Sequence, residues 1–205
     1  MDEATRALID VSCALSSGST GRLEAALRAA AAVAGPDAIE EALLQSYLFL
    51  GYPAALRGVQ AWRRVSGRPA PQAPSGDEAE WEERGIETCA RVYAGQYERL
   101  RANIAALHPD LERWMVVEGY GKVLGRPGLD LATRELCIVA LLAAQDAAPQ
   151  LYSHLRGALN AGAAEAIVEE AVRRMMGALP PDRARTLTEQ WHAVRARRNG
   201  SSQQA

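Results

Sequence analysis

The sequence predicts an all-α protein. Hydrophobic residues occupy 48% of the 205 positions, and long stretches of Ala, Leu, Arg and Glu leave almost no runs of β-branched residues, which is a helix-forming composition. Within these stretches, apolar residues recur three and four positions apart, as the buried face of a helix requires. Glycine and proline interrupt the pattern repeatedly, so we expect a series of helices joined by turns.

Residues 1–66 are predicted to form a small helical unit. Its turns are marked by a Ser/Gly-rich stretch over residues 16–21, by Gly35-Pro36 and by Gly51-Tyr52-Pro53. The helices between these turns are expected over residues 4–16, around Leu23–Ala31, around Ile39–Leu48 with an end at the Gly51 turn, and over residues 54–65. Residues 67–76 hold three prolines together with Ser, Gly and Gln, which predicts an extended linker.

Residues 77–198 are predicted to form a larger helical domain. Its acidic start favours the N-terminus of a helix that continues to about Tyr93, because negative charge stabilises that end of the helix dipole. Further helices are expected over Tyr97–Leu107 and from Pro109 onward. Residues 199–205 are small and polar and are predicted to be a disordered tail.

Two helices of this domain are predicted to form an antiparallel hairpin. Asp130 follows a Gly/Pro turn and can cap the first helix, which is apolar nearly all round and should therefore be central and buried. Pro149 suits the first position of the second helix, and Gly162 suits its end.

Glu135 and His154 are candidates for a catalytic pair on this hairpin. Counted from the turn, their positions differ by about 7 Å along the helices, so we expect a water or a substrate to bridge them. A carboxylate near an imidazole raises the pKa of the ring and orients its tautomer, which suits a general acid or base. The alternatives are a carboxylate that only serves the helix dipole and a histidine that is simply solvated or hydrogen-bonded.

The hairpin also resembles a known family. RPGLDLATREL, the apolar helix after it and SHLRGALNAGA resemble the signature of the carboxymuconolactone decarboxylase family, and WMVVEGYGKVLG resembles the segment that enters it. The resemblance covers about residues 85–175 and implies an alkylhydroperoxidase-like helical bundle with Glu135 and His154 at the active site. Related thiol-dependent peroxidases carry a CxxC pair that would fall on Ala147 and Gln150, where both cysteines are absent.

The N-terminal unit is similar to the hairpin region at an offset of 128 residues, which predicts an internal duplication. The turn between the helices falls in register. Identical residues in the first copy are Arg6, Leu8, Val11, Leu23, Leu27, Arg28, Ala30, Ile39 and Glu41. Ala7 and Ala26 stand where Glu135 and His154 stand in the second copy, so the first copy is predicted to be degenerate.

The first copy keeps one segment that the second lacks. Tyr47–Ala55 resembles the aromatic-Gly-aromatic-Pro segment that closes a domain of the decarboxylase family. Tyr52 can therefore complete a site that is built mainly from the second copy. The alternative is that these aromatic residues belong to an ordinary core.

The resemblance implies a decarboxylase that acts on a small carboxylated lactone or a related intermediate of aromatic degradation, with no metal or organic cofactor. Loss of CO₂ leaves a carbanion or enolate that needs a proton, so His154 is the predicted donor and Glu135 its partner. An anionic substrate needs cationic anchors and a walled pocket. The candidates are Arg126, Arg134, Arg156, Tyr120, Trp114 and Tyr52. Each arginine can alternatively form a surface ion pair.

Two other functions remain open from the sequence. One is a peroxidase-like or antioxidant protein of the same superfamily that lacks the CxxC pair. The other is a non-catalytic oligomeric binding protein. Because the apolar hairpin must be covered, we expect a homo-oligomer, either a trimer that imitates a hexamer or a dimer.

Charge and cysteine content limit the possible partners and the cellular location of the protein. The formal net charge of −2 argues against a nucleic-acid or membrane-surface partner. No apolar run approaches the roughly 18 residues of a spanning helix, and no secretory leader is apparent, so a cytoplasmic location is expected. Cys13, Cys89 and Cys137 are predicted to be reduced and partly buried. No cluster of His, Cys, Asp or Glu has metal-ligand spacing.

Overall fold

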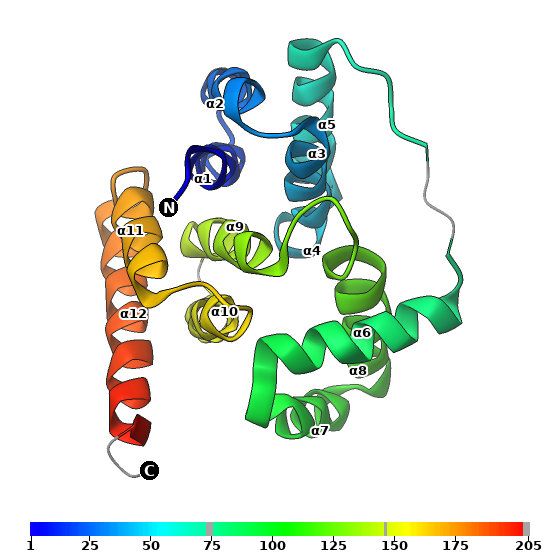
Figure 1. Cartoon of the computed structure of the whole chain (residues 1–205), viewed down its shortest axis with the longest axis vertical. Helices are drawn as coiled ribbons and strands as arrows, with labels where there is room; N and C mark the ends of the chain where they lie inside the picture. Colours follow the sequence, from blue (N-terminus) through cyan, green and yellow to red (C-terminus); the bar gives the residue numbers. More distant parts are fainter. Residues whose placement is uncertain (73–75, 146, 203–205) are drawn as a thin grey trace.

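The computed structural model describes residues 1–72, 76–145 and 147–202 (Figure 1). Over these residues it is helical and contains no strand, as the composition predicts. The N-terminal half comprises α1 (Glu3–Ser16), α2 (Thr20–Val33), α3 (Pro36–Gln45), α4 (Tyr47–Leu50) and α5 (Tyr52–Ser66). The remaining elements are α6 (Glu78–Tyr93), η1 (Ala94–Gln96), α7 (Tyr97–Leu107), α8 (Pro109–Trp114), η2 (Met115–Leu124), α9 (Leu131–Ala143), α10 (Ala148–Asn160), α11 (Glu165–Met176) and α12 (Pro181–Ser202).

The ends of the main helices follow local capping chemistry. Asp2, Ser19, Asp77 and Asp130 each accept a hydrogen bond from a backbone N–H in the first turn of α1, α2, α6 and α9, which satisfies donors that the helix itself leaves free. The predicted tail is partly helical, because α12 extends to Ser202. Residues 203–205 of that tail and residues 73–75 of the predicted linker lie outside the described residues.

The predicted helix over Ile39–Leu48 is broken at Ser46. Its Oγ donates to the carbonyl of Leu43 at 2.6 Å, and its backbone N–H bonds the same carbonyl. A serine that captures a nearby carbonyl competes with the regular helical bond. The chain therefore restarts as the short helix α4, which the sequence pattern did not reveal.

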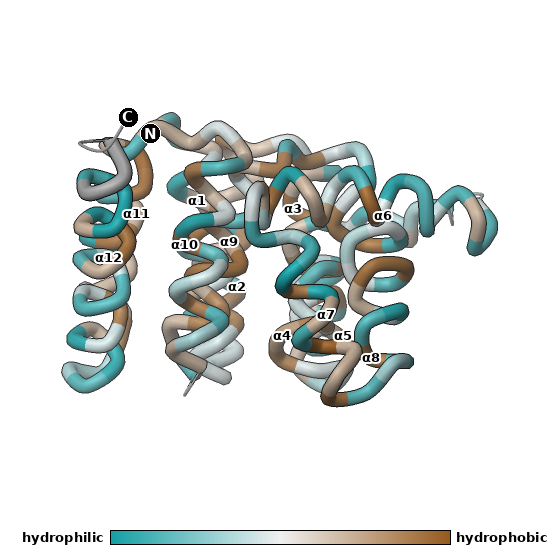
Figure 2. The backbone as a smooth tube through the Cα atoms, turned by 90° about the horizontal axis from the view of Figure 1, so that it is seen from below, coloured by the Kyte–Doolittle hydropathy of each residue, from teal (hydrophilic) through white to brown (hydrophobic). Residues whose placement is uncertain are grey.

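The hairpin of α9 and α10 lies at the centre of the molecule (Figure 1). From Thr133 to Ala143 every residue of α9 is buried, which confirms the prediction of a central helix. Figure 2 shows α11 and α12 at one end, the α1, α2, α9 and α10 group in the middle, and α3 to α8 at the other end. The hairpin is therefore covered on several sides by the rest of the chain.

The segment before the hairpin is a π-helix, η2, rather than the regular helix expected from Pro109 onward. It packs against α6 with the two backbones in contact. A Cβ at Gly85 would collide with the carbonyl of Val116, and a Cβ at Gly121 would collide with the carbonyl of Trp81. The two glycines thus permit an approach that side chains would prevent, and π-helical segments are frequent at functional sites.

The first helix of the N-terminal half and helix α9 of the C-terminal half each form an ion pair with the other half. Arg6 of α1 binds Glu170 of α11 at 2.8 Å, and Arg134 of α9 binds Glu41 of α3 at 2.9 Å. In the same way, Ile9 of α1 packs in the core of the C-terminal half. Cys137 of α9, which aligns with Ile9 in the predicted repeat, packs in the core of the N-terminal half.

A second matching contact lies inside each half. The indole N–H of Trp62 on α5 donates to Glu40 on α3, and that of Trp191 on α12 donates to Glu169 on α11, both at 3.1 Å. The same side-chain pair therefore joins the last two long helices of each half.

None of the helices in the described part of the chain is both long and apolar enough to span a lipid bilayer.

Candidate functional site

Glu135 and His154 are in direct contact. Nδ1 of His154 lies 2.8 Å from Oε2 of Glu135, so no bridging water or substrate is needed, contrary to the expected offset of about 7 Å. The expectation compared backbone positions on parallel axes, whereas the two extended side chains meet in the interface between α9 and α10. Both residues are buried, with 0% of Glu135 and 6% of His154 exposed.

Gly157 on α10 provides the space that the Glu135 carboxylate occupies. A Cβ at this position would collide with Oε2 of Glu135 and would lie 2.8 Å from Val92. The other carboxylate oxygen, Oε1, is buried and has no hydrogen-bond partner among the described residues. Burying a carboxylate with so few partners is unfavourable, and an unsatisfied buried polar group is a common mark of a functional site.

Replacing Gly157 by Ala should disturb the pair. We expect the added methyl group to displace the Glu135 carboxylate from His154 and to lower the free energy of unfolding by about 1–3 kcal/mol, as overpacking does. Gly21→Ala on α2 is the matched control, because no atom lies within 4 Å of a Cβ there. Urea unfolding of both variants checks this, and an undiminished Gly157→Ala midpoint would show that the carboxylate does not need this space.

His154 lines a cavity of about 320 Å³ between α4, the end of α6, α8 and η2. Most of its wall is apolar or aromatic, and it includes Leu48, Phe49, Tyr93, Leu111, Trp114, Met115, Tyr120 and Leu124. Trp114 and Tyr120, two of the predicted wall residues, line this cavity together with His154. Because Nδ1 of His154 is engaged by Glu135, Nε2 is the ring nitrogen left for a ligand in this cavity.

Two tyrosines supply neutral hydroxyl groups to the cavity. The rings of Tyr93 and Tyr120 lie 5.9 Å apart with an edge-to-face arrangement. Burial raises the pKa of both phenols, and the negative charge of Glu135 raises it further. Both hydroxyls therefore remain protonated donors at neutral pH. No sequence pattern distinguishes Tyr93, which lies at the last position of α6.

The N-terminal half completes the cavity through Phe49 rather than through Tyr52. The Phe49 ring stands edge-on to His154, with ring centroids 5.5 Å apart, and its carbonyl accepts a hydrogen bond from Gln145 at 2.8 Å. Gly51 has a φ of 77°, and the turn it allows carries the chain away from the cavity. Tyr52 is consequently 68% exposed and packs on Tyr47 instead.

The three arginines proposed as substrate anchors lie outside the lining of this cavity. Arg134 is completely buried, and burial lowers the pKa of its guanidinium. It binds Glu41 at 2.9 Å, as does Arg126. Arg156 lies over the ring of Tyr152, 6.0 Å from its centroid. Arg126 and Arg134 therefore join α3 to the hairpin, a role that their sequence context did not reveal.

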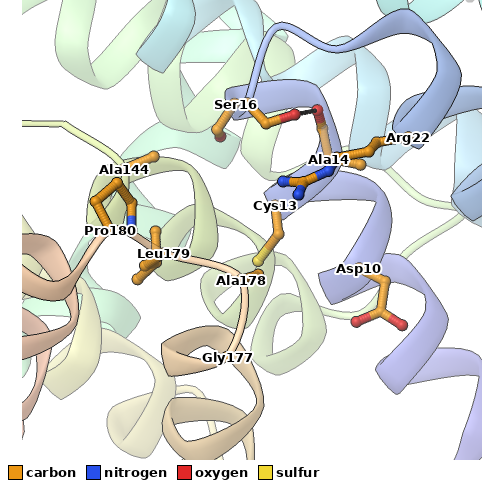
Figure 3. Close-up of a pocket in the computed structure, with 11 residues that line it drawn as sticks. Asp10, Cys13, Ala14, Ser16, Arg22, Ala144, Gly177, Ala178, Leu179 and Pro180 are labelled. Carbon is orange, nitrogen blue, oxygen red and sulfur yellow. Dashed lines mark hydrogen bonds between the residues drawn. The ribbon is translucent and has the colours of Figure 1, made fainter.

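A larger cavity lies elsewhere. It has a volume of about 780 Å³ and lies between α1 and the segment 177–180 (Figure 3). Asp10 and Cys13 face this space, but Asp10 binds Arg174 on α11. Burial raises the pKa of the Cys13 thiol to about 12. Without an acid–base pair or a reactive thiolate, this cavity is a weaker candidate than the smaller one beside His154.

The other thiols are equally unsuited to nucleophilic chemistry. Cys13, Cys89 and Cys137 are all unpaired, and burial raises the pKa of Cys89 and of Cys137 to about 12 as well. Only the thiolate is an effective nucleophile. The described residues also contain no group of three or more His, Cys, Asp or Glu side chains arranged to hold a metal ion.

Two comparisons with known proteins bear on this site. The model of the carboxymuconolactone decarboxylase family matches residues 109–185, a segment that contains both Glu135 and His154. Peroxisomal protein 2 of Schizosaccharomyces pombe is 29% identical over 137 residues, which cover 65% of this chain and 64% of that protein. The chain therefore spans slightly less than two thirds of the length of this curated relative.

Proposed function

We propose, from the match of residues 109–185 to the model of the carboxymuconolactone decarboxylase family, that the protein is a decarboxylase for a small carboxylated lactone or a related intermediate of aromatic degradation. The observation that carries the proposal is the buried contact between Glu135 and His154 beside a cavity. His154 is the proposed proton donor, and Glu135 is the residue that positions its ring.

The chemistry needs one well-placed acid. The bond between the carboxylate and its carbon breaks, CO₂ leaves, and the electron pair passes to the conjugated carbonyl as an enolate. His154 then donates the proton on Nε2 to the carbon, and the imidazole regains a proton from solvent. The net change is uptake of one proton and release of CO₂, and no oxidant or reductant is consumed.

The surroundings of the pair suit these steps. An apolar wall excludes water from the enolate. Because the hydroxyls of Tyr93 and Tyr120 hydrogen-bond to each other, the pair can offer one remaining O–H donor to the oxygen on which charge develops. The carboxylate of Glu135 accepts a hydrogen bond from Nδ1–H and stabilises the imidazolium form of the ring, whose second proton, on Nε2, is the one transferred in the proposed step. Each of these effects acts on the transition state, where it accelerates the reaction.

Replacing Glu135 by Gln tests whether Glu135 positions the His154 ring. Gln can still bond to Nδ1 but carries no charge to stabilise a protonated ring, so we expect kcat to fall by about 10²-fold. CO₂ release from carboxymuconolactone, the compound in the family's name, is the first assay to use. Glu87→Gln, an exposed residue on α6, is the matched control. Full activity of Glu135→Gln would contradict the positioning role.

Two alternatives are less well supported. A peroxidase of the same superfamily would need a reactive thiolate, whereas burial raises the pKa of each of the three thiols to about 12. A non-catalytic binding protein would have no need for a buried carboxylate with one unsatisfied oxygen. Decarboxylation uses both Glu135 and His154, and we therefore prefer it to the peroxidase and to the binding protein.

We also propose that the chain is a fused duplicate whose halves pack like two subunits of a dimer. The exchanged ion pairs support this, because residue i of one half binds residue j of the other and the reverse also holds, as in a twofold interface. Because Arg6 and Arg134 correspond to each other in the repeat, these contacts make Glu170 the counterpart of Glu41 in the second copy. The gap-free alignment instead paired Glu41 with Glu169. The repeat therefore needs a one-residue insertion before α11. Ala7 and Ala26 leave the first copy without a catalytic pair.

A homo-oligomer is the assembly that we propose, either a trimer of such pseudo-dimers or a dimer. Large apolar side chains remain exposed, among them Leu56 at 55% and Leu107 at 80%, and exposed apolar surface favours association. We expect light scattering at micromolar concentration to give the mass of three chains or of two. A monomer under these conditions would contradict the proposal and would leave the decarboxylase assignment intact.

We propose a cytoplasmic location, where free thiols such as those of Cys89 and Cys137 persist. The name of the Schizosaccharomyces pombe relative calls that protein peroxisomal. Imaging of a fluorescent fusion beside a peroxisomal marker distinguishes the two compartments.

A further inference from the structure

The cavity beside His154 limits the size and shape of the ligand that it can hold. Its volume of about 320 Å³ lies near the lower end of the range for small-molecule sites, which suits a ligand with a single ring. The aromatic side chains of Phe49, Tyr93 and Trp114 belong to its wall, and aromatic rings pack well against a flat ring. The cavity therefore favours a compact acid that contains one flat ring.

The same cavity can balance the charge of one carboxylate and no more. The described residues that line it include no lysine and no arginine, so the protonated ring of His154 supplies the one positive charge in its wall. Nδ1 of that ring is engaged by Glu135, which leaves Nε2 for a ligand carboxylate. A second carboxylate would be buried without a counter-charge, and burying an unpaired charge is costly.

Glu118 adds a negative charge to the wall of this cavity. It is exposed on η2 and lines the cavity together with His154. Burial raises the pKa of the Tyr47 phenol on α4, and the negative charge of Glu118 raises it further. The charge of Glu118 therefore acts across the cavity, from η2 toward α4.

The carboxylate of Glu118 is not neutralised by a neighbour. Its side chain forms no hydrogen bond or ion pair with any of the described residues. The nearest cations along the chain are engaged elsewhere. Arg113 binds Glu78 at 2.6 Å, and Lys122 lies over the ring of Trp81, 4.8 Å from its centroid. The Glu118 carboxylate is therefore free to repel an anionic group that enters the cavity.

We propose that the cavity beside His154 selects ring acids with a single carboxylate and that Glu118 is the residue that excludes acids with two. This inference rests on the proposed decarboxylase and names its substrate class, a small lactone or ring acid whose one carboxylate leaves as CO₂. When that carboxylate lies at Nε2 of His154, the carbon that it leaves is beside the proton donor. Selection of this kind depends on repelling the wrong substrate as well as on binding the right one.

Calorimetric titration of the full chain with two unreactive acids of nearly the same shape tests the proposal. Para-nitrobenzoate carries one negative charge, and terephthalate carries two on the same ring. We expect the unaltered protein to bind para-nitrobenzoate about tenfold more tightly, because like charges placed close together weaken binding. His154→Asn should weaken the binding of para-nitrobenzoate, which would locate the ligand in this cavity.

Glu118→Gln should remove most of the preference for para-nitrobenzoate by raising the affinity for terephthalate. Glu3→Gln is the matched control, because it removes the same charge from an exposed position on α1, and it should leave the preference unchanged. Carboxymuconolactone has two carboxyl groups, so the repulsion should raise its KM rather than lower its kcat. Glu118→Gln should therefore lower that KM by about tenfold.

Several results would overturn the proposal. One is equal or tighter binding of terephthalate by the unaltered protein, and another is a failure to bind either acid. Unchanged binding of para-nitrobenzoate by His154→Asn would show that the ligand lies elsewhere. An undiminished preference in Glu118→Gln would remove Glu118 from the selection. The decarboxylase assignment depends on CO₂ release instead, which the binding of unreactive acids does not measure, so the two failures are distinguishable.

Discussion

His154→Asn should nearly abolish CO₂ release, lowering kcat by about 10³-fold. The amide of Asn can take the place of Nδ1 and donate to Glu135, so the buried carboxylate keeps its partner. What the variant lacks is Nε2, the ring nitrogen that does not bond to Glu135 and that delivers the proton in the proposed reaction. Helix content should be retained, because the contact between α9 and α10 is preserved.

His192→Asn is the control for this experiment, since His192 is exposed on α12 and far along the chain from the cavity residues. It should leave kcat unchanged. If His154→Asn kept full turnover while its circular dichroism spectrum matched that of the unaltered protein, the proton-donor assignment would be wrong. Loss of turnover in both variants would point to a general effect of substitution on α10 and α12.

Glu41→Ala should cause the largest loss of stability. Glu41 binds both Arg126 and Arg134, and Arg134 has no exposed surface. Removing the carboxylate leaves a buried guanidinium without its counter-charge, which typically lowers the free energy of unfolding by about 3–5 kcal/mol. The backbone carbonyls of Arg126, Pro127 and Leu129, which also accept from Arg134, offset this only in part.

The reciprocal ion pair provides a matched comparison. Glu170 binds Arg6 just as Glu41 binds Arg134, but the Glu170 and Arg6 side chains are about one third exposed, so water can replace the lost partner. Urea denaturation should therefore show a much smaller shift for Glu170→Ala than for Glu41→Ala. Equal shifts would mean that burial does not distinguish the two pairs, and the account of Arg134 as an internal tie would fail.

The sequence predicted the helices well because their signals are local. Capping residues such as Asp130 and the all-round apolar pattern of α9 act within a few residues, and the structure bears both out. The break at Ser46 is also local, but a serine bonds a nearby carbonyl inside an unbroken helix as well, as Ser12 does, so its sequence context carried no distinct signal. The π-helix η2 was missed for the opposite reason. The shape of η2 depends on the approach of α6 through Gly85 and Gly121, residues far apart along the chain.

In the candidate site, too, some features follow from the sequence alone and others only from the packing of the chain. By itself the sequence determined the candidate groups, because a carboxylate and an imidazole in a segment that resembles a family signature point to Glu135 and His154 without coordinates. Only the tertiary structure decided that they touch, that Phe49 rather than Tyr52 closes the cavity, and that Arg134 binds Glu41 inside the protein. These outcomes depend on how helices cross and on which side chains lose contact with water, and those are properties of the packed chain rather than of any local pattern.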